Sequence, residues 1–158
     1  MWIIDHSTTT AQAAGQSGGN RGKGGDLLYR WGNPLTYNTG NISNRKYFEQ
    51  HDVEWVKPNC PVAGNLTCYN NGLGRTPLYS TVDEITPPVD AIGNYAFVSG
   101  SAFGPTNFTW SYTANPPESL YSENISGAQR QQNGNTLICE SAHGDFTEIT
   151  TAGEIVLC

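Results

Sequence analysis

The chain has 158 residues, of which 37% are hydrophobic and 14% are charged, and its formal net charge is −6 at pH 7. This length suits one ordinary domain, and the negative charge argues against nucleic acid or an anionic membrane as partner, because both bind through a basic face. No apolar run approaches the roughly 20 residues of a transmembrane helix, so we predict no membrane span.

The N-terminal part predicts two strands separated by a Gly-rich loop. Met1–Asp5 lacks the charged start and long apolar centre of a signal peptide, so we expect the sequence to begin inside a fold, as in a processed or partial product. Leu27–Gly32 predicts the second strand. The loop hints at a phosphate-binding motif, but Ser17 stands where its first Gly belongs and Gly24 where a Ser or Thr must bind magnesium. We interpret it as a flexible basic surface loop.

Two longer stretches each predict four strands from their period-2 alternation and their Gly, Pro and Asn-Gly punctuation. The strands are expected at 51–56, 64–70, 79–86 and 108–112, and again at 125–131, 134–140, 145–150 and 154–158. Gly64–Asn70 resembles Gly134–Glu140, so the two stretches are copies of one repeat. Residues 87–107 form a long insertion within the first copy.

Repeated four-stranded sheets are typical of β-propeller blades. We therefore predict an all-β fold of about two and a half blades: a partial blade at 1–49, a blade at 50–118 and a last blade at 119–158. Propellers typically need about four to eight blades, so this chain is not a closed ring by itself. Either a longer protein supplies the other blades, or further copies cover the open faces through heterologous contacts.

Four cysteines fit two disulfides in an oxidising compartment, with three possible connectivities. Cys60 and Cys68 could clip a short hairpin. Cys139 and Cys158 are expected on strands two apart in one sheet, about 10 Å from each other and too far for a bridge, so Cys158 could pair elsewhere, including with another chain. The alternative is buried free thiols in an intracellular protein.

Four N-glycosylation sequons, at Asn41, Asn65, Asn107 and Asn124, are a mild excess over chance. Together with the cysteines they favour a secreted glycoprotein. Cysteines and histidines lack the paired short spacing of a zinc site, so we predict no metal, and nothing in the sequence calls for a cofactor.

A histidine and an arginine mark the ends of neighbouring segments. His51 heads one predicted strand, and Arg75 ends the Gly-rich turn after the next. Together they suit transfer of an anionic group such as sulfuryl, because an imidazole can attack while a guanidinium holds tetrahedral oxygens. The alternative is that His51 merely starts a strand and Arg75 closes a turn.

Several segments, taken in order, resemble the last blades of the arylsulfate sulfotransferase family. They are Trp2–Ser7, Gln50–Trp55, Tyr69–Arg75, Leu120–Gln129 and Gly134–Glu140. Members of that family are six-bladed propellers that transfer sulfate between phenols without the nucleotide donor PAPS, through a histidine that becomes transiently sulfated. The resemblance covers nearly the whole chain but only the C-terminal part of a family member.

The resemblance implies that His51 is the nucleophile, with a phenolic sulfate as donor and a phenol as acceptor. Arg75 would help to hold the sulfate oxygens, although it could equally close its turn. Asp52 would orient the imidazole or simply cap the strand, and Asn71 would contact substrate. His6 lies near the position of a sulfate-binding basic residue in the family.

The departures from the family pattern define a second hypothesis. The other channel histidines of the family come from earlier blades that this chain lacks, and His143 is expected to be exposed and inert. Bound sulfate would then lose most of its positive surroundings, and a glycan on Asn124 would crowd the site. The competing hypothesis is a non-catalytic secreted glycoprotein module that self-associates through its open blade faces into an extracellular filament or another assembly.

Overall fold

The computed structural model describes residues 1–157, and the chain divides into two compact units. Residues 1–46 and 87–106 form the first unit, and residues 47–86 with the chain from Asn107 onward form the second. The segment predicted as an insertion, residues 87–107, therefore packs almost entirely with the N-terminal segment rather than with the strands that flank it.

The first unit is mostly loop around a two-stranded antiparallel sheet. Its strands are β1 (Trp2–Ile3) and β2 (Tyr29–Arg30), as the sequence predicted. A single helical turn, α1 (Thr10–Ala13), precedes the Gly-rich loop, and two short 3-10 helices, η1 (Pro34–Tyr37) and η2 (Ile42–Asn44), follow β2. No described helix of residues 1–157 has the length and apolar character needed to cross a membrane.

An aromatic cluster holds the first unit together. The fully buried Tyr29 ring lies 5.1 Å from the ring of Tyr95 and 5.3 Å from that of Phe103, measured between centroids. Its hydroxyl donates a hydrogen bond to the carbonyl oxygen of Gly104 at 2.6 Å. Because aromatic side chains bury large apolar areas, these contacts explain why residues 87–106 pack on β2.

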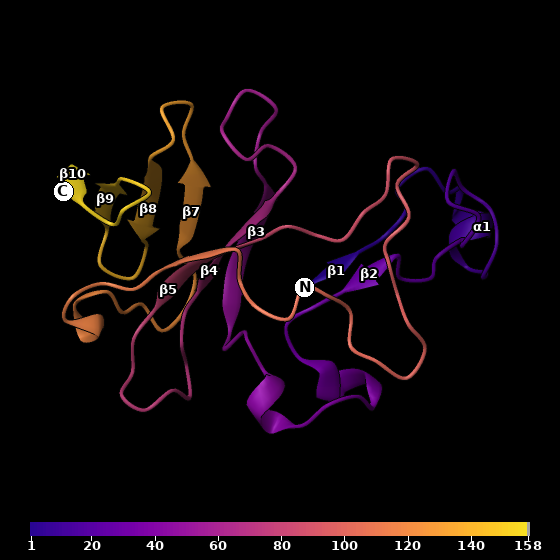
Figure 1. Ribbon diagram of the computed structural model, residues 1–158, viewed down its shortest axis with the longest axis horizontal. Coiled ribbons are helices and arrows are strands. Elements are labelled where there is room, and N and C mark those ends of the chain that lie inside the picture. Colours follow the sequence, from indigo (N-terminus) through magenta and orange to yellow (C-terminus); the bar gives the residue numbers. More distant parts are fainter. Residues whose placement is uncertain (158) are drawn as a thin grey trace. The chain divides into compact units, whose positions relative to one another are not determined.

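The second unit contains the first four-stranded antiparallel sheet, a meander in the order β3-β4-β5-β6 (Figure 1). The strands are β3 (Gln50–Trp55), β4 (Leu66–Asn70), β5 (Thr81–Ile85) and β6 (Trp110–Tyr112). Every residue of β4 and β5 is buried, so these two central strands are covered on both faces.

A second meander follows in the order β7-β8-β9-β10, and β7 lies beside β3 and β4 of the first sheet (Figure 1). Its strands are β7 (Gly127–Arg130), β8 (Thr136–Glu140), β9 (Asp145–Ile149) and β10 (Ile155–Leu157). A 3-10 turn, η3 (Pro117–Ser119), leads into it. The all-β prediction and both four-stranded copies are confirmed, and none of the described sheets is closed.

The hydrophobic core of the second unit lies between its two sheets. Tyr69 and Val82 come from the first sheet, and Ala128, Ile138 and Ile149 come from the second; all five are at most 2% exposed. Period-2 alternation places these side chains on the facing sides of their strands. The arrangement is that of two sheets packed face to face.

A buried ion pair also joins the two sheets. Arg130 on β7 donates from Nη2 to Oε2 of Glu84 on β5 at 2.8 Å, and both side chains are at most 3% exposed. Asn65 donates from Nδ2 to the other carboxylate oxygen at 2.7 Å. The guanidinium carbon of Arg130 lies 4.6 Å from the ring centroid of Trp110. Such partners compensate the desolvation of both charges.

The three described cysteines are free thiols, so the predicted clip between Cys60 and Cys68 is not formed. Instead, the Cys60 thiol donates to the carbonyl oxygen of Arg130 at 3.4 Å and the Cys68 thiol to that of His51 at 3.5 Å. Burial, followed by the charge of Asp83, raises the pKa of the Cys68 thiol well above its usual range. Cys158 lies outside the described residues.

Candidate functional site

The imidazole of His51 is held by a single hydrogen bond to Asn71. His51 pairs across the sheet with Tyr69, and the chain bulges between His51 and Glu54. Its Nδ1 lies 2.8 Å from Oδ1 of Asn71, which follows β4 directly. Strand β3 therefore positions the ring, and the residue after the neighbouring strand orients it.

The side chain of Asn71 can present only its oxygen to His51. Its Nδ2 donates to the carbonyl oxygens of Ser122 at 2.8 Å and Ile125 at 2.9 Å. Turning the amide over would place its oxygen against two other oxygens, so the network assigns the orientation. His51 must then donate from Nδ1, which leaves the Nε2 lone pair of the neutral ring free for chemistry.

A buried polar network fixes Asn71 itself. The Asn71 side chain is fully buried, and the backbone carbonyl oxygen of Asn71 accepts a hydrogen bond from the hydroxyl of Ser80 at 2.9 Å. Ser80 also accepts from the backbone N–H of Ser122 at 3.0 Å. The turn at 120–126 therefore fixes the side-chain amide of Asn71. The sequence predicts Asn71 as a substrate contact, which stays a prediction; in the structure its Oδ1 is hydrogen-bonded to the His51 imidazole.

Within residues 1–157 no hydrogen bond joins the side chains of Asp52 and His51. Asp52 sits in the β3 bulge with a φ of +52°, a conformation that Asp tolerates better than most residues. Its Oδ2 accepts a hydrogen bond from the backbone N–H of Ala128 on β7 at 3.1 Å. Asp52 thus ties β3 to the second sheet, and the side chain that is hydrogen-bonded to the imidazole is that of Asn71.

The guanidinium of Arg75 is occupied by its own turn. It donates to the carbonyl oxygen of Tyr79 at 3.1 Å and to the hydroxyl of Thr81 at 3.3 Å, and its carbon lies 4.6 Å from the Tyr79 ring centroid. Burial lowers the pKa of Arg75. In the same turn Gly72 has a φ of +82°, and a Cβ there would collide with the Tyr79 carbonyl group. These contacts fit the alternative in which Arg75 closes its own turn.

Asp83 of β5 is a buried carboxylate that the sequence pattern did not single out. It is fully buried and accepts hydrogen bonds from Ser111 at 2.6 Å, Asn70 at 2.8 Å and Thr81 at 3.0 Å. Burial raises its pKa, while these hydrogen bonds and the charge of Arg75 act in the opposite direction. The signal that the sequence offered was a pair of adjacent acidic residues, Asp83 and Glu84, inside an otherwise buried strand.

The other two histidines do not join this site. His6 is exposed and, with Asp5 and Arg21, lines a small pocket of about 240 Å³ inside the first unit, whereas His51 belongs to the second. Hydrogen bonds from Ser7 lower the pKa of Asp5. His143 is exposed in a turn as predicted, with Nδ1 3.6 Å from Oε1 of Glu140.

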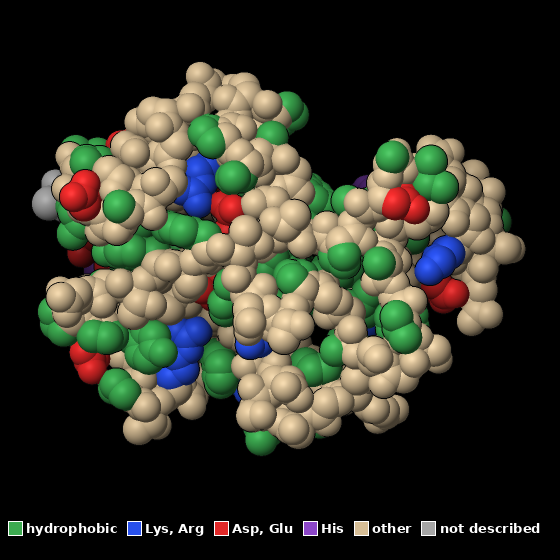
Figure 2. Space-filling view, viewed as in Figure 1, with side chains coloured by type: hydrophobic (Ala, Val, Ile, Leu, Met, Phe, Trp, Pro, Cys, Tyr) green, Lys and Arg blue, Asp and Glu red, His purple; other side chains and the backbone are tan. Residues whose placement is uncertain are grey.

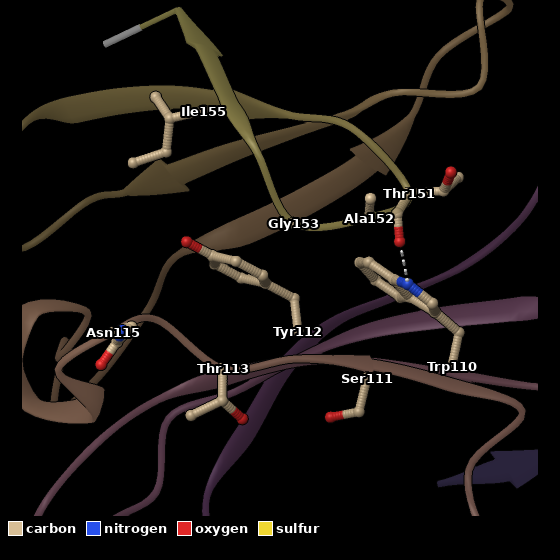
Figure 3. A pocket seen from close by; sticks show the side chains of 9 residues that line it. All are labelled: Trp110, Ser111, Tyr112, Thr113, Asn115, Thr151, Ala152, Gly153 and Ile155. Atoms are coloured by element: carbon tan, nitrogen blue, oxygen red, sulfur yellow. Dashed lines mark hydrogen bonds between the residues drawn. The ribbon is translucent and has the colours of Figure 1, made fainter.

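A wider groove of about 500 Å³ opens at the β6 edge of the second unit (Figure 3). The rings of Trp110 and Tyr112 point toward the turn before β10, and Trp110 donates from Nε1 to the carbonyl oxygen of Thr151 at 2.9 Å. None of its lining residues carries an Asp, Glu, Lys, Arg or His side chain. Because β6 and β3 are opposite edges of the sheet, this groove is separate from His51.

The four sequons differ in their accessibility. Asn65 is 7% exposed, and its amide nitrogen is bonded to Glu84, so a glycan there would disrupt the buried ion pair. Asn41, Asn107 and Asn124 are exposed. Folded structure therefore leaves these three, and not Asn65, open to a glycan.

The described residues show no cluster of metal ligands, and the face drawn in Figure 2 shows no basic patch. Within residues 1–157 no group of three or more His, Cys, Asp or Glu side chains could hold a metal ion. On the face shown in Figure 2, Lys and Arg side chains are scattered rather than gathered in a patch.

Comparison of the chain with family models, with curated proteins and with solved structures gave no match.

Proposed function

We propose that this chain is the C-terminal part of a propeller-type arylsulfate sulfotransferase and that His51 carries the sulfuryl group between phenols. One observation supports this proposal most directly. The Nδ1–H of His51 is directed at Asn71, whose amide is fixed by two carbonyl oxygens, and this leaves Nε2 as the nucleophilic atom.

The proposed transfer has two displacement steps at sulfur. The Nε2 lone pair attacks the sulfur of an aryl sulfate, a nitrogen–sulfur bond forms, and the aryl oxygen–sulfur bond breaks. The phenolate leaves with the bonding electron pair and takes a proton from water. The acceptor phenol then loses its proton to the hydroxide left by the first step, and its oxygen attacks the sulfur. The nitrogen–sulfur bond breaks, and Nε2 regains its electron pair.

Asn71 has a defined part in both steps. The sulfated ring carries a positive charge, and its Nδ1–H continues to donate to the Asn71 oxygen. Arg75 is engaged by its own turn. In the proposal, the cationic groups that hold the sulfate oxygens therefore come from further blades around His51.

The test uses 4-nitrophenyl sulfate as donor and phenol as acceptor. We expect the protein that carries this chain together with its further blades to release 4-nitrophenolate and to gain one SO₃ group by intact mass, with both signals lost in His51→Gln. His143→Gln is the matched control, because His143 is an exposed histidine in a turn, and it should behave as the unchanged chain. No release and no mass gain, or equal gain in His51→Gln, would refute the proposal.

Asn71→Ala tests the positioning role. We expect the transfer rate to fall about 10- to 100-fold, the usual cost of losing the group that orients a histidine. Nitrogen NMR of the imidazole supplies a readout that a general loss of stability does not move. The unchanged chain should show the Nδ1–H tautomer, and the variant should show a mixture.

We propose as a second candidate a non-catalytic secreted module that assembles through open sheet faces. The observation that favours it is the apolar exposure of the second four-stranded sheet: Phe146, Ile155 and Leu157 are each 55% to 58% exposed. Large apolar side chains left exposed on a sheet can be covered by a partner, and exposed apolar surface commonly marks interaction sites. Ordered multimers carrying glycans on the exposed sequons would favour this candidate over catalysis.

A further inference from the structure

The two four-stranded sheets repeat one polar arrangement, but only the first sheet completes it. In the first, Asn65 donates from Nδ2 to Oε1 of Glu84 at 2.7 Å. In the second, Asn135 donates from Nδ2 to Oε1 of Glu148 at 2.6 Å. Both pairs join the start of the second strand of a copy to the third strand, so Glu148 is the repeat equivalent of Glu84.

The difference between the copies is an arginine. Oε2 of Glu84 accepts from Arg130, which belongs to the next sheet along the chain. Among residues 1–157, no Lys or Arg pairs with Glu148. Hydrogen bonds from Asn135 and Asn133 lower the pKa of this carboxyl, which favours its charged form.

Glu148 and the apolar side chains beside it form a surface that we call the outer face: Leu137, Cys139, Phe146 and Glu148. Direct pairing of Leu137 with Glu148 and of Cys139 with Phe146 puts all four on one side of the sheet. The repeat equivalents in the first sheet include Val82 and Glu84, and those side chains are buried against the second sheet. The outer face has no such cover in the second unit, and Phe146 is 56% exposed.

A complementary surface exists on the first unit, and we call it the Trp2 face: Trp2 and Arg30. These two residues pair directly across β1 and β2, so they share the side opposite to the buried Tyr29. Trp2 is 69% exposed. Arg30 packs on the ring of Tyr37, and both of its hydrogen bonds leave from Nη2 to Thr36, whereas Arg75 uses Nη1 as well as Nη2. No carboxylate of the described chain pairs with Arg30.

We propose that the outer face of one copy binds the Trp2 face of a second copy, with Arg30 taking the place beside Glu148 that Arg130 takes beside Glu84. A strand of another sheet then covers Phe146, and Trp2 supplies the aromatic area typical of interface centres. Because the two surfaces differ, the contact is heterologous and generates rings or filaments. The contact deepens the second candidate function and does not depend on sulfuryl transfer.

The test is the mass of the chain in solution, measured by light scattering with reductant present to exclude disulfide-linked multimers. We expect concentration-dependent oligomers that become monomers in Trp2→Glu and in Phe146→Glu. Ile42→Glu and Val62→Glu are matched controls, 69% and 51% exposed and outside both faces, and they should leave the mass unchanged. Far-UV circular dichroism checks that every variant is folded.

Mixing the two blocked variants tests the head-to-tail arrangement. The outer face of Trp2→Glu and the Trp2 face of Phe146→Glu are both intact, so an equal mixture should form dimers and nothing larger. Arg30→Glu and Glu148→Arg should each weaken association about tenfold, and combining them in one chain should restore it. A chain that stays monomeric, association that survives either blocked variant, or a mixture that remains monomeric would overturn the proposal.

Discussion

Asn71 determines which nitrogen of His51 is available, although it lies behind the ring and is fully buried. Its influence comes from the carbonyl groups of Ser122 and Ile125, which accept both of its amide protons. A side chain at the start of one loop is thus controlled by a turn about 50 residues later. The tautomer of His51 therefore depends on the hydrogen-bond partners of Asn71 and not on the histidine alone.

Asp83 provides a test of the buried polar network. Burial raises its pKa above the usual value of 3.8, so the folded chain binds the proton more tightly than the unfolded chain. The free energy of unfolding should therefore fall as pH rises from the unfolded pKa through the folded pKa, and acidification toward about pH 4 should restore it. Asp83→Asn removes this titration and keeps an oxygen that can accept from Asn70 and Thr81.

Urea unfolding of both chains at several pH values gives the relevant difference. The free energy of unfolding of the unchanged chain minus that of Asp83→Asn should become more positive as pH falls. Titration of the other carboxyl groups cancels in this difference. Asp83→Ala should cost about 2–4 kcal/mol at each pH, since it leaves the buried donors of Asn70 and Thr81 without their acceptor. A pH-independent difference between the unchanged chain and Asp83→Asn would contradict this account.

At the scale of elements, the sheets were well predicted because their boundaries carry strong local signals. Gly64 and Gly134, with φ near +90°, mark the turns before β4 and β8. What the sequence could not predict is contact between strands far apart in the chain. Glu84 and Arg130 are 46 residues apart, and nothing in either segment identifies the other as its partner.

The site shows the same division. The sequence singled out His51 and placed it at the head of β3. It offered Arg75 as a sulfate-holding residue, but the side chain is used by the Tyr79 turn, because a guanidinium can be satisfied by nearby carbonyl and hydroxyl groups. It predicted Asp52 as the residue that orients the imidazole, whereas the imidazole is hydrogen-bonded to Asn71, whose amide is fixed by the turn at 120–126.

The ion pair between β5 and β7 allows a prediction about sheet packing. Arg130→Met leaves Glu84 buried with only Asn65 as partner, so we expect the free energy of unfolding to fall by about 3–5 kcal/mol. Glu84→Gln combined with Arg130→Met removes both charges and should cost clearly less than the sum of the single variants. Chemical denaturation measures all four chains. Additive costs would show that the pair does not couple the sheets.

At the scale of the whole molecule, three open sheets of two, four and four strands leave apolar surface exposed. The two proposed functions answer this in different ways. In the first, further blades cover the open faces and bring cationic groups to His51. In the second, other copies cover them. The mass measurement and the sulfuryl assay are independent, so failure of one leaves the other interpretable.

The cysteines give a last prediction for the whole chain, because the sequence favoured disulfides and the structure shows free thiols at Cys60, Cys68 and Cys139. If no bridge constrains the unfolded chain, reductant should leave the melting temperature of the monomeric Phe146→Glu chain unchanged, whereas loss of a native disulfide typically costs about 2–5 kcal/mol. A thiol reagent should label the partly exposed Cys139 in the folded chain, and Cys60 and Cys68 only after unfolding, since both are buried. A fall in melting temperature on reduction would mean that a bridge forms in solution and would support the oxidising compartment that the sequons suggest.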